Sequence, residues 1–188
     1  MNQEDISGDE LSDIVICFRY VPVLLCQQPD NVFNATEWSC KIINQEFFHA
    51  IHDATIFNDG QLDNLLIASY EGINWLYFNP ESEQWKIEHV GDGEQEKIPQ
   101  AIYWCNGDID VGRIENEPLP YMVAIKPFHG NVISAYVKNT KNSLKNIQWK
   151  RYTLDVYGYP NDNGESSAHY IACGDFDKDR DDEFLVAL

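Results

Sequence analysis

Residues 173–188 read CGDFDKDRDDEFLVAL, an acidic turn followed directly by an apolar run. Acidic side chains stand at positions 1, 3, 5 and 9 of the turn, namely Asp175, Asp177, Asp179 and Glu183. Carboxylates at alternating positions of a tight turn bring their oxygens toward one point, which suits a hard cation such as Ca²⁺ or Mg²⁺. An EF-hand would add a bidentate Glu at position 12 and a helix after it, and neither is present. The segment predicts a cation-binding turn that leads into a β-strand.

The same pattern recurs upstream, which makes it a repeat rather than a single motif. Copies begin at residues 5, 55, 108 and 175, at intervals of 50, 53 and 67 residues. The copy opened by Asp108 and Asp110 is stretched before its apolar run, and each of the others ends on an acid directly before one. A period near 50 residues with β-type runs is typical of propeller blades. We therefore expect Asp13, Asp63 and Glu183 to be structurally equivalent.

The whole chain consists of short β-type runs separated by turn formers, and no segment has a helical period. Repeat units are expected at 1–46, 47–97, 98–168 and 169–188, the last one truncated. Their strands are expected at 14–20, 22–25 and 38–43; at 48–54, 64–69, 73–78 and 85–90; at 101–105, 121–125, 132–137 and 147–152; and at 169–173 and 184–188. Three, four, four and two strands cannot close a ring. The predicted fold is all-β, a partial β-propeller of three to four antiparallel four-stranded blades in an open arc.

Composition narrows the class of protein. Of 188 residues, 44% are hydrophobic and 13% aromatic, which excludes a disordered chain. The net charge of −18 argues against nucleic-acid binding, because no basic surface could displace phosphate counterions. No apolar run could cross a bilayer and no signal peptide is visible, so we expect no membrane partner and a cytoplasmic or otherwise intracellular protein. Without CxxC spacing, the cysteines are expected to be buried free thiols, at Cys17, Cys26, Cys40, Cys105 and Cys173.

The acidic turn with its flanking strands, 169–188, resembles the FG-GAP and VCBS class of propeller repeats, and specifically the propeller domain of the aldos-2-ulose dehydratase family of carbohydrate lyases. The resemblance extends over residues 5–188 as a repeat. It implies a seven-bladed propeller followed by cupin-type domains, in an enzyme that dehydrates oxidised sugars such as glucosone or anhydrofructose. On that basis this chain is a fragment, inactive alone, that lacks further blades and cupin domains. One departure is Arg180, which stands where the turn usually has a glycine that can adopt a positive φ.

Two turns are candidate metal sites, with Ca²⁺ or Mg²⁺ in a structural and also conceivable catalytic role. The first comprises Asp175, Asp177, Asp179, Glu183 and the backbone carbonyl of Asp181, and the second comprises Asp5, Ser7, Asp9 and Asp13. The alternative is a solvated acidic turn held by Asx hydrogen bonds. No metal is expected at 55–63, where Thr55 and Phe57 replace ligands, or in the copy that begins at residue 108.

The histidines are candidate catalytic bases because of their register. His49 lies six positions before Thr55 and His169 six before Asp175, which predicts equivalent places near the central channel, with His52 close by. Dehydration of a sugar begins with removal of a proton next to a carbonyl, and imidazole has a suitable pKa. Each could instead be a structural histidine. Likewise, Tyr103 and Trp104 could form a sugar-stacking wall or belong to the core.

Two functions from different classes remain open at this point. In the first, the chain is part of a sugar-dehydrating carbon–oxygen lyase with a small sugar as substrate, in which a channel histidine is the base and a cation polarises the carbonyl. In the second, it is a non-catalytic propeller that uses cations for rigidity and binds a protein or glycan partner. Fold analogy does not separate them.

Overall fold

The computed structural model describes residues 5–7, 9–17, 22–44, 48–58, 62–93, 106–117, 119–126, 130–138, 148–159, 161–162 and 166–188. Within these ranges every regular element is a strand, and the strands form four antiparallel sheets of three, four, four and two strands. The predicted all-β fold class is confirmed. No helix in the described part of the chain is long and apolar enough to cross a membrane.

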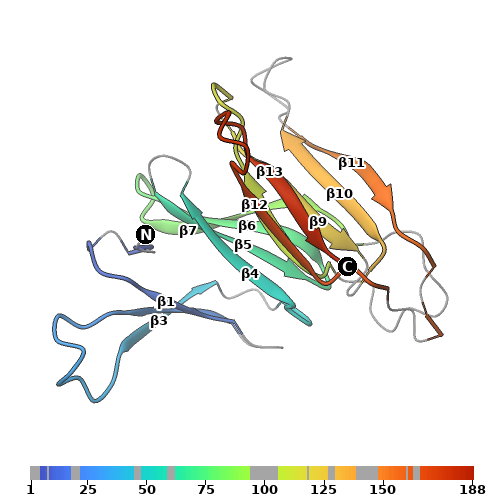
Figure 1. Cartoon of the computed structure of the whole chain (residues 1–188). Coiled ribbons are helices and arrows are strands. Elements are labelled where there is room, and N and C mark those ends of the chain that lie inside the picture. Colours follow the sequence, from blue (N-terminus) through green and yellow to red (C-terminus); the bar gives the residue numbers. More distant parts are fainter. Residues whose placement is uncertain are drawn as a thin grey trace.

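The sheets pack against one another in chain order, with one shared core between each consecutive pair. Figure 1 colours them from the blue N-terminal sheet to the red pair of C-terminal strands. The first contains β1 (Ile14–Ile16), β2 (Val23–Gln27) and β3 (Ser39–Asn44). The second contains β4 (Asp53–Asn58), β5 (Asp63–Ser69), β6 (Gly72–Asn79) and β7 (Gln84–Gly91). The third contains β8 (Ile109–Gly112), β9 (Tyr121–Lys126), β10 (Val132–Lys138) and β11 (Trp149–Val156). The fourth contains β12 (Tyr170–Gly174) and β13 (Glu183–Ala187).

Neighbouring sheets pack face to face, as blades of a propeller do. Because successive side chains of a strand point to opposite faces, Leu65 of β5 packs toward the first sheet and Leu66 toward the third. In β9, Met122 likewise belongs to the core shared with the second sheet and Val123 to the core shared with the fourth. Burial on both faces explains why these second strands are almost continuously apolar. The first strands β4, β8 and β12 are neighbours at the inner side of the arc, with β8 between the other two.

The inner strands of two blades lie later in the chain than predicted. We expected a strand at 48–54 and a loop from Thr55, but β4 spans Asp53–Asn58. Similarly, β8 occupies Ile109–Gly112, where the stretched loop was expected, and the predicted strand 101–105 lies outside the described residues. The acids at these places belong to strands rather than turns. Acid spacing alone does not distinguish an acidic turn from a strand whose edge carries carboxylates.

The equivalence of the three strand-entry acids is confirmed. Asp13 directly precedes β1, Asp63 pairs with Asn58 at the start of β5, and Glu183 pairs with Gly174 at the start of β13. Only residues 59–62 separate β4 from β5, whereas residues 175–182 separate β12 from β13. The shorter turn places Thr55 inside β4, so Thr55 does not correspond to Asp175.

The free-thiol prediction is wrong for two cysteines. Cys26 of β2 and Cys40 of β3 are directly opposite each other and form a disulfide. Cys17 and Cys173 are free thiols, and Cys105, Tyr103 and Trp104 lie outside the described residues. The sequence offered no signal for the pair, because their juxtaposition depends on the register between β2 and β3.

Candidate functional site

The turn between β12 and β13 brings three carboxylates together. Ligand oxygens of Asp175, Asp177 and Glu183 lie within 4.8 Å of one another, the only such group of three or more acidic, histidine or cysteine side chains in the described part of the chain. Backbone N–H groups hold them there: Asp179 and Arg180 donate to the two oxygens of Asp175 at 3.0 and 3.1 Å. Phe176 N–H donates to Glu183 at 3.0 Å. Close carboxylates repel one another unless a proton or cation neutralises them, so the turn has the geometry of a cation site.

Asp179, a predicted side-chain ligand, lies outside this group, and so does the side chain of Asp181, of which only the backbone carbonyl was predicted to be a ligand. Asp179 accepts a hydrogen bond from the N–H of Asp181 at 2.9 Å, and Asp181 accepts one from the N–H of Glu115 at 2.6 Å. The second of these contacts belongs to a docking surface between the turn and the segment that follows β8. There Arg113 N–H donates to Asp182 at 2.7 Å and the Arg180 guanidinium pairs with Glu115 at 2.7 Å.

The first turn, residues 5–13, is built in the same way. Asp9 and Glu10 N–H groups donate to the two oxygens of Asp5 at 3.0 and 2.7 Å, as Asp179 and Arg180 do to Asp175. Asp13 is only 5% exposed; one of its oxygens accepts from Ser7 N–H at 2.7 Å, and the other is buried without a hydrogen-bond partner. Its acids nevertheless do not form a convergent group of three like that of the second turn.

A second group of polar residues lies at the opposite end of the inner strands. His52 directly precedes β4, Asp108 precedes β8 and His169 precedes β12. The acidic turn of residues 175–183 follows β12, a strand of five residues, which spans about 16 Å at 3.3 Å per residue. A cation held by Asp175, Asp177 and Glu183 is therefore too far from His169 to act on the same carbonyl group.

His169 lies near enough to His52 to affect the pKa of His52. Burial lowers the pKa of His52, and His169 lowers it further, against the opposing effects of a hydrogen bond with the Gly107 backbone and of the Asp53 carboxylate. The net effect favours the neutral imidazole, which is the form that accepts a proton.

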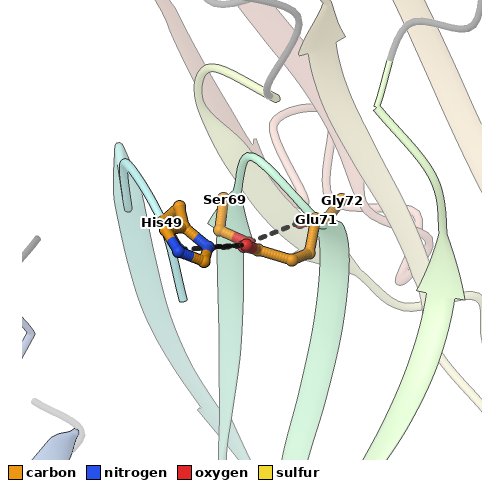
Figure 2. A network of polar contacts seen from close by, with 4 residues as sticks. All are labelled: His49, Ser69, Glu71 and Gly72. Carbon is orange, nitrogen blue, oxygen red and sulfur yellow. Dashed lines mark hydrogen bonds and ion pairs between the residues drawn. The ribbon is translucent and has the colours of Figure 1, made fainter. Parts of the chain in front are cut away.

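His49 has a different environment, shown in Figure 2. The ring Nδ1 of His49 contacts the Glu71 carboxylate, and the backbone N–H of His49 donates to Glu71 Oε2 at 3.0 Å. Ser69 Oγ donates to the same oxygen at 2.9 Å. Burial alone would raise the pKa of Glu71, but these hydrogen bonds outweigh it and the pKa is lowered. His49 thus joins the segment before β4 to the turn between β5 and β6 through its contacts with Glu71. The predicted equivalence of His49 and His169 is wrong, because it assumed turns of equal length after β4 and β12.

Three carboxylates that we had not proposed for the channel lie along the inner strands and bind the backbone of the following blade. Asp53 accepts from Ile109 N–H at 3.2 Å, Asp108 from Ile171 N–H at 2.6 Å and Asp110 from Cys173 N–H at 2.7 Å. Burial is the main cause that raises the pKa of Asp108 to about 7; the nearby Asp53 and Asp110 raise it further, against the Ile171 hydrogen bond. The alternation Asp108-Ile109-Asp110-Val111 was the available signal. It indicates a strand with carboxylates along one side.

A groove of about 480 Å³ opens next to His52, between β1 and β4. Its lining comprises Asp13, Ile14, Val15, Cys17, Ile51, His52, Asp53, Ala54 and Ile56. Burial, and then the charge of Asp53, raise the pKa of Cys17 to about 11. The thiol therefore stays protonated near neutral pH and is a poor nucleophile, so histidine and carboxylate are the reactive groups of this region.

Comparison with known proteins agrees with this architecture. Residues 16–139, more than half of the chain, match the family described as aldos-2-ulose dehydratase, beta-propeller domain. Over 174 residues the chain is 29% identical to the aldos-2-ulose dehydratase of Phanerodontia chrysosporium, which covers 88% of this chain and 19% of that protein. The chain spans about a fifth of the length of this curated relative. With its blades, strand-entry acids and family match, the chain belongs to the aldos-2-ulose dehydratase β-propeller family.

Proposed function

We propose that this chain is the propeller part of a carbon–oxygen lyase that dehydrates an aldos-2-ulose. The name of the relative states that reaction class, and the match covers 88% of this chain. The structural observation that carries the proposal is the equivalent position of His52 and His169, each directly before an inner strand, with a groove of about 480 Å³ beside His52. Inner-strand ends surround the axis of a propeller, where a small polar substrate can be enclosed.

In the proposed reaction His52 is the general base. It takes a proton from the carbon next to the sugar carbonyl, the electron pair of that C–H bond forms a carbon–carbon double bond, and the hydroxyl on the next carbon leaves. A proton returned to that hydroxyl releases it as water, and in this proposal His169, which is exposed, supplies that proton. The lowered pKa of His52 favours its role as base, because the neutral ring is available at neutral pH.

The cation turns have a structural role in this proposal. Asp175, Asp177 and Glu183 would hold Ca²⁺ or Mg²⁺, whose charge would neutralise three converging carboxylates. The turn of Asp5, Ser7, Asp9 and Asp13 is a second candidate, supported by the buried oxygen of Asp13 that has no hydrogen-bond partner. A catalytic cation is not proposed for either turn, because both precede second strands, at the end of the blades away from His169.

The test is to incubate the full polypeptide that the gene encodes with glucosone and with anhydrofructose, and to follow the absorbance of the enone product. We expect His52→Ala and His169→Ala to lower kcat by about 100-fold or more, the range of general acid–base catalysis. His89→Ala is the matched control, because His89 lies on β7 and bonds to Asn74 and Asp92. Full activity of His52→Ala would refute the assigned base. A folded protein that binds cations but turns over neither sugar would favour the non-catalytic propeller.

A further inference from the structure

The inner strands β8 and β12 are each the terminal strand of their sheet, so one edge of each has backbone groups without a strand partner in the described part of the chain. Such groups need other partners when they are buried. At Ile109, the preceding blade supplies both partners: Asp53 accepts from its N–H at 3.2 Å, and Thr55 Oγ1 donates to its carbonyl at 3.0 Å. Two side chains of β4 thus replace the hydrogen bonds of a neighbouring strand.

The same arrangement recurs at the junction between the third and fourth blades, between β8 and β12. Asp108 and Asp110 of the third blade accept from the N–H groups of Ile171 and Cys173 on β12, at 2.6 and 2.7 Å. Both partners advance by two residues, so β8 and β12 run parallel with their ends in register. At both junctions the earlier blade therefore presents a carboxylate to the inner edge of the blade that follows it.

These contacts connect the two candidate catalytic histidines. His52 is adjacent to Asp53 and has a hydrogen bond with the backbone of Gly107. Gly107 is adjacent to Asp108, whose carboxylate binds Ile171, two residues after His169. The connection runs from one histidine to the other through the residues that enter β8, without passing through the outer strands.

We infer that Asp53 and Asp108 are positioning residues, which set the separation of His52 and His169 by docking three consecutive inner strands edge to edge. The catalytic consequence rests on the proposed function, whereas the docking itself does not. Neither carboxylate is assigned contact with the substrate.

The ionisation of Asp108 adds a pH dependence to this docking. The groups that face it are Asp53 from β4, Asp110 from its own strand and the Ile171 N–H from β12, so the two charged neighbours both disfavour its ionised form. Its pKa is raised from 3.8 to about 7 in the folded protein, and the folded state therefore binds more protons than the unfolded state between these values. Stability contributed at this residue should decline as the pH rises from about 4 to 7.

Asp108→Asn and Asp108→Ala, with the exposed Asp30→Asn as control, test the inference in the full chain. The amide of asparagine can accept from Ile171 and donate to Asp53 without ionising, so this variant should keep the docking and lose the pH dependence. We expect its Tm relative to that of the wild type to rise by about 5–10 °C between pH 5 and pH 8. Hydrogen exchange at the Ile171 amide should be wild-type in Asp108→Asn and at least about tenfold faster in Asp108→Ala, which leaves the N–H without an acceptor.

Kinetics provide the readout specific to positioning. In an active enzyme, Asp108→Ala should lower kcat with little change in KM, and Asp108→Asn should restore it. If the wild type has no dehydratase activity, the proposed function fails while the exchange and Tm measurements still test the docking. Slow Ile171 exchange in Asp108→Ala, or an Asp108→Asn protein whose Tm follows the wild-type course with pH, would overturn the inference.

Discussion

Arg180 and Glu10 occupy the same place in the two acidic turns and both have left-handed backbone conformations, with φ of 82° and 68°. Only glycine adopts this region without a steric cost, which is roughly 1–2 kcal/mol for other residues. The hydrogen bond from each N–H to the first aspartate of its turn holds the conformation. Arg180, which stands where the turn usually has a glycine, therefore keeps the shape of the turn at a steric cost in stability.

We predict that the free energy of unfolding is highest for Arg180→Gly, intermediate for the wild type and lowest for Arg180→Val. Glycine relieves the backbone, but part of the gain is offset by its flexibility in the unfolded chain, so the net increase should be about 0.5 kcal/mol. Valine, branched at Cβ, should cost about 1–2 kcal/mol. The exposed Arg180–Glu115 ion pair contributes little, and Arg180→Lys is the control for its charge. Chemical denaturation measures the series; a glycine variant less stable than valine would contradict the argument.

Glu71 supports a second prediction at this scale. Its pKa is lowered in the folded state, so its contribution is present above the ordinary value of 4.5 and is lost as the pH falls through the folded value. Glu71→Gln should lower stability by about 1 kcal/mol at pH 7, through weaker hydrogen bonds to His49 and Ser69, and by progressively less as the pH falls below 4.5 through the folded pKa. Thermal unfolding against pH measures this difference, with the exposed Glu81→Gln as control. A difference that does not shrink as the pH falls below 4.5 would mean that the charge of Glu71 is not its source.

At the scale of the element, the acidic turn is both a potential cation site and a docking surface. On one side of the turn, carboxylate oxygens lie close together, those of Asp175, Asp177 and Glu183. On the other side, Asp181 and Asp182 bind the backbone of residues 113–115 of the preceding blade. The stretched loop after β8 therefore has a partner that its sequence did not reveal. Substitution of an aspartate inside the convergent group and of one outside it should therefore have different effects on cation binding.

We expect Asp177→Ala to abolish binding of one Ca²⁺ in calorimetry, and Asp179→Ala to leave it measurable, because only Asp177 belongs to the convergent group. Cation at about 100 times its Kd should stabilise the wild type by about 3 kcal/mol through mass action, and should not stabilise Asp177→Ala. Without added cation, Asp177→Ala should be no less stable than the wild type, since it removes a repelling charge. If the folded wild type binds neither Ca²⁺ nor Mg²⁺, the segment is only an acidic turn.

At the scale of the whole molecule, β13 pairs only with β12 in the described part of the chain, so its other edge has no strand partner there. Leu185 of β13 is 59% exposed, and Leu188, which follows the strand, is 64% exposed. An apolar strand edge without a neighbour recruits other chains. The exposed edge of β13, a red strand in Figure 1, is therefore a surface on which copies of the chain can associate.

We predict that the 188-residue chain associates at micromolar concentration in sedimentation velocity. Leu185→Lys should restore a monomer, because a charged side chain on an edge strand opposes pairing. Phe33→Lys is the matched control: Phe33 is 97% exposed but lies in the loop between β2 and β3, and its substitution should leave the association unchanged. A cooperative monomer of the wild type would show that this edge is protected in another way.

Local sequence was sufficient for the strand count, the blade order and the strand-entry acids Asp13, Asp63 and Glu183. Side-chain alternation, turn formers and the position of an acid before an apolar run all depend on a few neighbouring residues, and they have the same meaning wherever the segment lies. The second strands could be located from this information because burial on both faces requires continuous apolar runs, as in β5 and β9.

Local sequence was insufficient for the inner strands, for the Cys26–Cys40 disulfide and for the pairing of His52, rather than His49, with His169. The disulfide depends on the register between β2 and β3, which places Cys26 opposite Cys40. The inner strands and the histidines depend on turn lengths and on the docking of one blade against the next, through contacts between segments about 60 residues apart, such as Asp53 with Ile109 and Asp108 with Ile171. An aspartate beside a strand has the same local signature whether it binds a cation or caps a neighbouring strand. Only the packed blades determine which partner it meets.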